Sequence, residues 1–265
     1  MKSWNVFILC VIVVILVFFV IKIKPFYSPA VKQDGLLVTR HYDDTIRIAY
    51  IGDSWADNHK AVDCVIDSIV GFVMGKPVLV KTSGVSGLTS KNIYYGIFWN
   101  NSFRDIIEWG PDFCFVVAGI NDSDRKMGKW YYKENMRLIM ELLLENGITP
   151  IVLEIPSYDI FFSFKRRNRL IKFQYLVSML LTGSKMNCIE DYRKELVKLI
   201  EEQNWTDKVI YIDSDEWNPN GYKDTRSLYD GGRMHLNVNG YHVLDSCIAH
   251  KIIQFIDKIP DNGCP

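Results

Sequence analysis

Residues 46–55 read IRIAYIGDSW, an apolar run that ends in a polar turn. The run Ile46–Ile51 predicts a short buried strand, and the Gly-Asp-Ser sequence after it predicts a sharp turn into a helix. Four more short apolar runs follow along the chain, and a longer amphipathic segment separates each from the next. This alternation predicts a parallel sheet with helices on both of its faces.

The periodicity of apolar residues assigns the individual elements. Five strands are expected, at Ile46–Ile51, Val78–Lys81, Phe113–Ala118, Thr149–Glu154 and Val209–Asp213. Helices are expected at about 58–73, 91–109, 130–146, 189–203 and 237–256. The globular domain therefore extends over residues 46–258, with a short tail at 259–265.

The amino terminus differs in composition from the rest. Trp4–Ile21 is an almost unbroken apolar run, just long enough to cross a bilayer. We expect residues 1–23 to be a single transmembrane anchor, with the globular domain on the exported side; a signal peptide cleaved after Ala30 is the alternative. Residues 24–45 have no apolar period and are expected to be a linker that lifts the domain off the membrane.

Composition excludes two classes of partner. The chain has 31 basic and 31 acidic residues, so it lacks the positive charge that a phosphate backbone requires, and no nucleic acid is expected. Six cysteines are present, but they form no CxxC pair, which argues against a zinc or redox site. No metal or cofactor is predicted.

Four short polar motifs follow predicted strands. They are GDSW (residues 52–55), GVSGLTS (84–90), GIND (119–122) and RMHLNVNG (233–240). Taken singly, each is compatible with an ordinary turn or helix cap. However, the carboxyl ends of parallel strands meet at one rim, where the motifs bring a hydroxyl nucleophile at Ser54 close to two oxyanion donors, Gly87 and Asn121.

One histidine is placed to act as a base. His41 lies in the expected linker, and His59, His242 and His250 fall within predicted helices, where surface or core roles are the default. His235 alone lies between the fifth strand and the last helix, at the same rim as Ser54. We therefore interpret His235 as the general base of an acyl-transfer site.

Together these motifs resemble the SGNH hydrolases, also called GDSL-type esterases and lipases. The resemblance implies a flavodoxin-like three-layer α/β/α fold. It also implies that Ser54 is the nucleophile and His235 the base, and that the oxyanion hole is formed by Ser54, Gly87 and Asn121.

The chain departs from the family pattern in two places. Trp55 stands where the family commonly has leucine, and Gly232 stands where it usually has the aspartate that orients the histidine. Asp230 is the nearest upstream acid and our choice for that role; Asp224, or a Ser54–His235 dyad without an acid, are the alternatives.

An insertion at about 158–186 separates the fourth strand from the next helix. It combines aromatic, basic and apolar residues. Two interpretations fit it equally well. One is a helical hairpin that covers the sheet edge. The other is a basic amphipathic surface on anionic lipid, or a lid over the acyl site.

By this resemblance, a membrane-tethered domain is expected to act on acyl esters, most readily O-acetyl esters of a cell-envelope carbohydrate. O-acyl transfer, a lipid esterase and a catalytically silent glycan-binding module are the alternatives.

Overall fold

Five parallel strands form a single central sheet. The computed structural model describes residues 4, 7–8, 10–11, 24–221, 228–231 and 234–258. The strands are β1 (Ile46–Gly52), β2 (Val78–Gly84), β3 (Phe113–Val117), β4 (Thr149–Leu153) and β5 (Ile210–Ile212). Their order across the sheet is β2-β1-β3-β4-β5, and every neighbouring pair is parallel. This is the flavodoxin-like order, so the predicted fold is confirmed.

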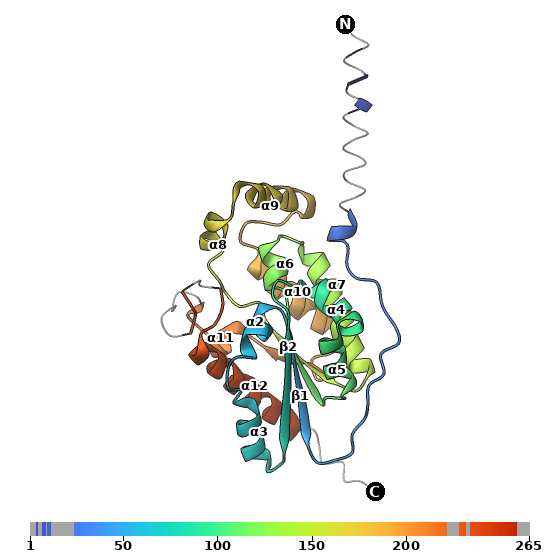
Figure 1. Ribbon diagram of the computed structural model, residues 1–265, viewed down its shortest axis with the longest axis vertical. Coiled ribbons are helices and arrows are strands. Elements are labelled where there is room, and N and C mark those ends of the chain that lie inside the picture. Colours follow the sequence, from blue (N-terminus) through green and yellow to red (C-terminus); the bar gives the residue numbers. More distant parts are fainter. Residues whose placement is uncertain are drawn as a thin grey trace.

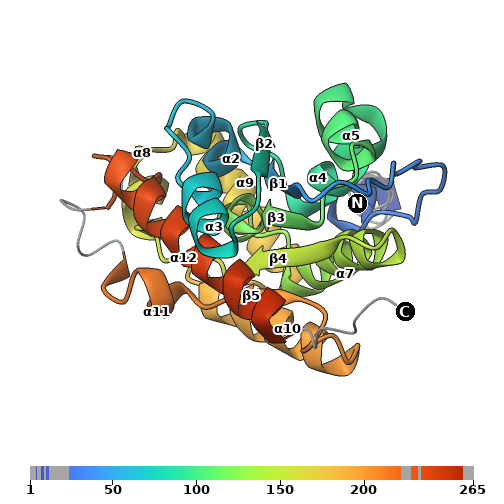
Figure 2. The ribbon, with the colours of Figure 1, turned by 90° about the horizontal axis from the view of Figure 1, so that it is seen from below.

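Helices cover both faces of the sheet and complete three layers (Figures 1 and 2). One layer contains α2 (Ser54–His59), α3 (Ile66–Met74), α11 (Ser214–Trp217) and α12 (Val238–Lys258). The other contains α4 (Ser90–Trp99), α5 (Asn101–Glu108), α7 (Lys129–Glu145) and α10 (Ile189–Glu202). The short α6 (Ile120–Asp124) follows β3. Every residue of β3 and nearly every residue of β1 is buried, as expected for central strands covered on both faces.

Two of the expected helices are each divided into two. The segment expected to be one helix at 91–109 breaks at Asn100, whose side chain accepts a hydrogen bond from Ser102 N at 3.0 Å and caps α5. The segment expected at 58–73 is divided between α2 and α3. The first of these begins earlier than expected, at Ser54, because the Asp53 side chain caps it.

The insertion folds into α8 (Ile160–Arg166) and α9 (Arg169–Thr182). Both helices lie beyond the carboxyl ends of the strands, over the rim where the polar motifs gather (Figure 1). Arg167 Nη2 pairs with Asp124 Oδ2 at 3.0 Å, and Lys126 Nζ donates to Met186 O at 2.6 Å, so the turn between α8 and α9 and the end of the insertion are fixed to the region of α6. The insertion is thus a helical hairpin over the rim and not over a sheet edge.

Residues 24–45 form a strap on the outside of the domain. After the 3-10 helix η1 (Lys24–Tyr27), the strap runs the length of the molecule to the start of β1 (Figure 1). Ala30 N donates to Asn135 Oδ1 at 2.8 Å, Gln33 N donates to Tyr94 OH at 2.8 Å, and Thr39 N donates to Glu108 O at 2.9 Å. The expected linker is therefore attached to the domain along its course.

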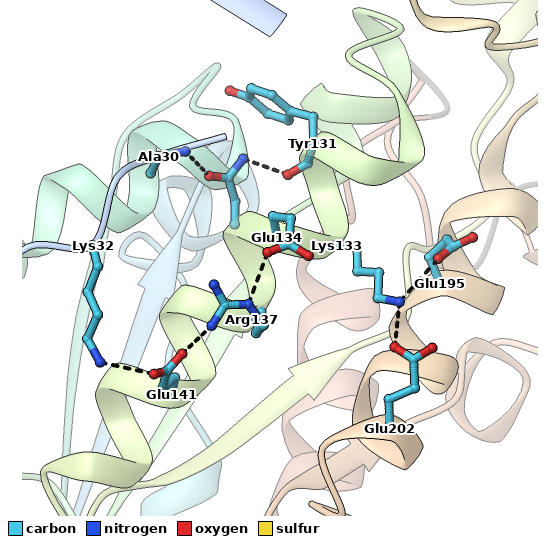
Figure 3. Close-up of polar contacts among 10 residues, drawn as sticks. Ala30, Lys32, Tyr131, Lys133, Glu134, Arg137, Glu141, Glu195 and Glu202 are labelled. Atoms are coloured by element: carbon cyan, nitrogen blue, oxygen red, sulfur yellow. Dashed lines mark hydrogen bonds and ion pairs between the residues drawn. The ribbon is translucent and has the colours of Figure 1, made fainter. Parts of the chain in front are cut away.

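A row of ion pairs supports the strap (Figure 3). Lys32 Nζ contacts Glu141 at 3.0 Å and Glu145 at 2.8 Å, and Glu141 also pairs with Arg137 on α7. Exposed pairs of this kind add little stability individually. Asn135 differs, because it is fully buried and its Nδ2 also donates to Tyr131 O at 2.7 Å.

None of the helices in the described part of the chain is both long and apolar enough to cross a bilayer. Most of Trp4–Ile21, and the tail at 259–265, lie outside the described residues. The N-terminal anchor therefore remains a prediction.

We expect Asn135→Ala to lower the free energy of unfolding by about 1–3 kcal/mol, because it removes a buried side chain and leaves the half-buried N–H of Ala30 without its acceptor. Urea denaturation measures this. Lys32→Ala is the control, and it should change stability much less, since its ion pairs are exposed. Equal effects of the two substitutions would show that the strap is not held at Asn135.

Candidate active site

Four sequence motifs meet in one cavity at the carboxyl ends of the strands. The cavity has a volume of about 930 Å³, and Ser54, Gly87, Asn121 and His235 all contribute to its lining. Each residue comes from a different loop, following β1, β2, β3 and β5 respectively. The structure thus brings together the four side chains and backbone groups selected from the sequence.

Ser54 is presented by a tight turn between β1 and α2. Gly52 precedes the turn, and a Cβ at this position would lie 2.4 Å from Val117 O on the neighbouring strand, so only glycine fits. Ser54 Oγ lies 2.9 Å from His235 Nε2. When the hydroxyl donates to Nε2, the imidazole proton is on Nδ1, as a general base requires.

Trp55 connects the nucleophile turn to the histidine loop. The indole is fully buried, and its Nε1 donates to Met234 O at 3.0 Å, one residue before His235. Tyr241 OH on α12 donates to Trp55 O at 3.1 Å. The residue that replaces the usual leucine therefore holds the base in place, a role that sequence reasoning missed. A buried tryptophan needs a hydrogen-bond acceptor for its N–H. That requirement is the sequence feature that could have indicated this role for Trp55.

Asn121 and Gly87 line the same cavity as Ser54. Asn121 Nδ2 donates to Asp53 Oδ2 at 3.1 Å and to Leu88 O at 3.0 Å. Gly87 has φ of +83°, a conformation that favours glycine, and its carbonyl accepts from Arg125 Nη2 at 2.8 Å. These contacts fix the loop that carries Gly87 against the loop that carries Asn121.

Two buried carboxyl groups support the site. Burial raises the pKa of Asp53 to about 7, although hydrogen bonds from Trp55 N and Asn121 oppose the rise. Burial also raises the pKa of Asp122 to about 6, against hydrogen bonds from Ser90. Ser90 N and Oγ both donate to Asp122, which ties the start of α4 to α6. Neither carboxyl group lines the cavity, so we assign them to positioning.

Asp230 lies beside His235 but not within hydrogen-bonding distance. Its Oδ2 is 3.9 Å from His235 Nδ1. Asp230 N donates to His235 O at 2.9 Å, and Tyr229 and Leu236 form an antiparallel bridge, so the chain folds back on itself here. This hairpin explains how an acid upstream of the usual position approaches the ring. Asp224 and Gly232 lie outside the described residues.

The surroundings of His235 act on its pKa in opposite directions. Burial lowers the pKa below its usual value, and the charge of Asp230 raises it. The imidazole is therefore neutral, and able to accept a proton, at neutral pH.

A second acid–histidine pair lies elsewhere. His59 Nε2 on α2 is 2.9 Å from Asp245 Oδ1 on α12, and both side chains are buried. Cys64 is close enough to complete a possible three-ligand cluster, but burial raises the pKa of its thiol to about 12, which disfavours the thiolate that a metal binds. We interpret this cluster as a structural contact between helices.

The fold and this arrangement of hydroxyl, imidazole and amide donors are those of an α/β ester hydrolase. The model of the GDSL-like Lipase/Acylhydrolase family matches residues 50–243, and the chain belongs to that family. The expected family membership and the expected ester-hydrolase class are thereby confirmed.

Solved structures show the same fold. A lipase/acylhydrolase from Enterococcus faecalis is 18% identical, with a TM-score of 0.54 over 78% of this chain and 95% of that chain. An acetylxylan esterase from Geobacillus stearothermophilus is 16% identical, with a TM-score of 0.53 over 78% and 94% of the two chains. No curated protein sequence matches the chain.

We expect Trp55→Phe to lower kcat by about ten- to a hundredfold, because loss of the hydrogen bond to Met234 O lets the imidazole move relative to Ser54. Steady-state kinetics with p-nitrophenyl acetate measures this, and circular dichroism monitors the fold. An unchanged kcat would mean that Trp55 only fills the core.

The pH dependence of kcat/KM tests the role of Asp230. Because the base must be neutral, we expect activity to fall as the pH drops through a pKa below the ordinary value of histidine. Asp230→Asn removes the charge that raises this pKa, so the acidic limb should move to lower pH. Its kcat should fall by about tenfold, less than the roughly ten-thousand-fold loss that follows removal of a directly hydrogen-bonded acid. Asp224→Asn is the matched control. A shift of the acidic limb in that variant alone would assign to Asp224 the role of the acid that acts on His235.

Proposed function

We propose that the chain is a membrane-anchored serine esterase that cleaves O-acyl esters, with O-acetyl groups of a cell-envelope carbohydrate as its substrate. The single observation that carries the proposal is the 2.9 Å contact between Ser54 Oγ and His235 Nε2 inside a cavity of about 930 Å³. Family membership supports the ester chemistry. The apolar run Trp4–Ile21 supports the anchor, with the catalytic domain on the exported side.

In the proposed mechanism, Ser54 Oγ attacks the ester carbonyl carbon while His235 Nε2 accepts the hydroxyl proton. The tetrahedral intermediate collapses, and the C–O bond to the sugar breaks as His235 returns the proton to the leaving alcohol. Water, deprotonated by the same imidazole, then releases the acyl group from Ser54. Asp230 stabilises the imidazolium through its charge, at 3.9 Å.

Backbone N–H groups of Ser54 and Gly87 and the side chain of Asn121 are the proposed oxyanion donors. Both Nδ2 hydrogens of Asn121 already have acceptors, Asp53 Oδ2 and Leu88 O. Asn121 must therefore exchange one of these bonds for the substrate oxygen. The buried bond to Asp53 keeps the amide oriented, so the bond to Leu88 O is the one we expect to be released.

The lining of the cavity supports a carbohydrate substrate. Aromatic rings of Phe26, Tyr27 and Tyr175 provide flat apolar surfaces, and Arg125 and Gln174 provide hydrogen-bond donors. The acetylxylan esterase that shares the fold is named for an acetylated sugar polymer. Hydrolysis and transfer use the same acyl-enzyme, and the acceptor alone distinguishes them.

A lipid esterase is the second candidate. Ile171, Phe173, Val177 and Met234 also line the cavity, whose volume exceeds what an acetyl group fills. A long acyl chain would bury these side chains. Comparing kcat/KM for p-nitrophenyl acetate and p-nitrophenyl octanoate separates the two, since an acetyl esterase should prefer the acetate.

We expect Ser54→Ala to abolish hydrolysis of p-nitrophenyl acetate without unfolding the domain, because the hydroxyl faces the cavity and not the core. Ser86→Ala is the matched control. Ser86 lines the same cavity, but its Oγ donates to Asp57 at 2.8 Å, away from His235.

Near-normal turnover by folded Ser54→Ala protein would reject Ser54 as the nucleophile. A wild-type chain that hydrolyses neither ester, yet binds acetylated oligosaccharide, would instead be a silent glycan-binding module.

A further inference from the structure

Helix α9 lines the cavity and also exposes apolar side chains to solvent. Helix α9 directs Tyr175 and Ser178 inward, where both are buried and line the cavity. Its outer face contains Leu170, Leu176, Leu180 and Leu181, which are 67%, 54%, 84% and 44% exposed, and Phe173, which is 62% exposed and also reaches the cavity. These residues recur at helical spacing, and α9 has no charged residue after Lys172. A soluble surface helix normally places polar residues on such a face.

Basic residues outnumber acidic ones in the insertion, where Asp159, the N-cap of α8, is the one acid. Between Ile160 and Cys188 the sequence has no acidic residue and six basic ones, Lys165, Arg166, Arg167, Arg169, Lys172 and Lys185. Arg167 is paired with Asp124, whereas Lys165, Arg166, Arg169 and Lys185 are exposed. In a chain with no net charge, exposed basic residues therefore gather in the same segment as the exposed apolar residues of α9.

The strap fixes the amino-terminal segment next to the same helix. Tyr27 OH is hydrogen-bonded to Ser178 Oγ on α9, and Lys91 Nζ donates to Pro25 O at 3.0 Å and to Ser28 O at 2.8 Å. The 3-10 helix η1, which follows the predicted membrane segment, is thus attached to α9 at Tyr27. Phe26 is 56% exposed and lines the cavity together with Phe173, so the cavity opens at this surface.

We propose that the outer face of α9, together with Phe26 and Phe161, rests on the surface of an anionic lipid bilayer. Apolar side chains at this face enter the boundary between headgroups and acyl chains, and the surrounding lysines and arginines pair with lipid phosphates. The contact rests on the membrane location in the proposed function and adds detail to it. It does not depend on the chemistry of Ser54. It presents the mouth of the cavity to substrates held at the membrane surface.

Hydrogen exchange in the full chain tests this contact. The chain is mixed with vesicles of phosphatidylcholine, or of phosphatidylcholine with phosphatidylglycerol, and sedimentation reports how much is bound. We expect the amides of α9 to exchange about tenfold more slowly with anionic vesicles than with neutral ones. High salt should reduce the difference. The amides of α3, at the far end of the domain in Figure 1, should not change.

The double variant Leu176→Glu/Leu180→Glu should lose the slow exchange of α9 but still sediment through residues 1–23. Phe72→Glu is the matched control, because Phe72 is 90% exposed on α3, and it should behave as wild type. Circular dichroism checks that each variant is folded.

Three results would overturn the proposal. The wild-type chain could sediment with anionic vesicles without slower exchange of the α9 amides. That result would mean that residues 1–23 alone bind the vesicles, and it would reject the proposed contact of the outer face of α9. The double variant could retain the slow exchange. Alternatively, α9 could become protected without lipid as protein concentration rises, which would assign the face to a second copy of the chain. Ser54→Ala protein should give the wild-type exchange result, so failure of the esterase assignment is measured separately.

Discussion

The carboxyl group of Asp53 joins three of the four loops that build the site. One oxygen caps the helix that begins with Ser54, and the other accepts from Asn121, which in turn holds the loop of Gly87 through Leu88 O. Full burial makes this charge costly, as the raised pKa of about 7 shows. The site depends on it because Asp53 and Asn121 fix each other at the base of the cavity. The fourth loop depends on Trp55, which follows Ser54 directly.

The fold and the principal site residues follow from local patterns in the sequence. Apolar runs such as Ile46–Ile51 and Phe113–Ala118 each end in a polar turn, and the parallel connection rule then brings the turns to one rim. Ser54, Gly87, Asn121 and His235 could be selected for this reason before any coordinates were known.

The remaining features depend on contacts that have no local pattern. The break at Asn100 is set by a side-chain cap, and the helix from 91 looks continuous without it. The approach of Asp230 to His235 requires the bridge between Tyr229 and Leu236, which no spacing rule encodes. The bond from Trp55 to Met234 joins residues far apart in the chain. Such long-range pairs are visible only in three dimensions.

The strap also limits how far the active site can move from residue 24. A free chain over residues 24–45 would extend up to about 70 Å and would let the active site sample a wide volume around its point of attachment. Hydrogen bonds to Asn135, Tyr94 and Glu108 remove this freedom. The segment from η1 to β1 is therefore held against the domain, so the active site keeps a fixed position relative to residue 24 and reaches only esters that come close to it.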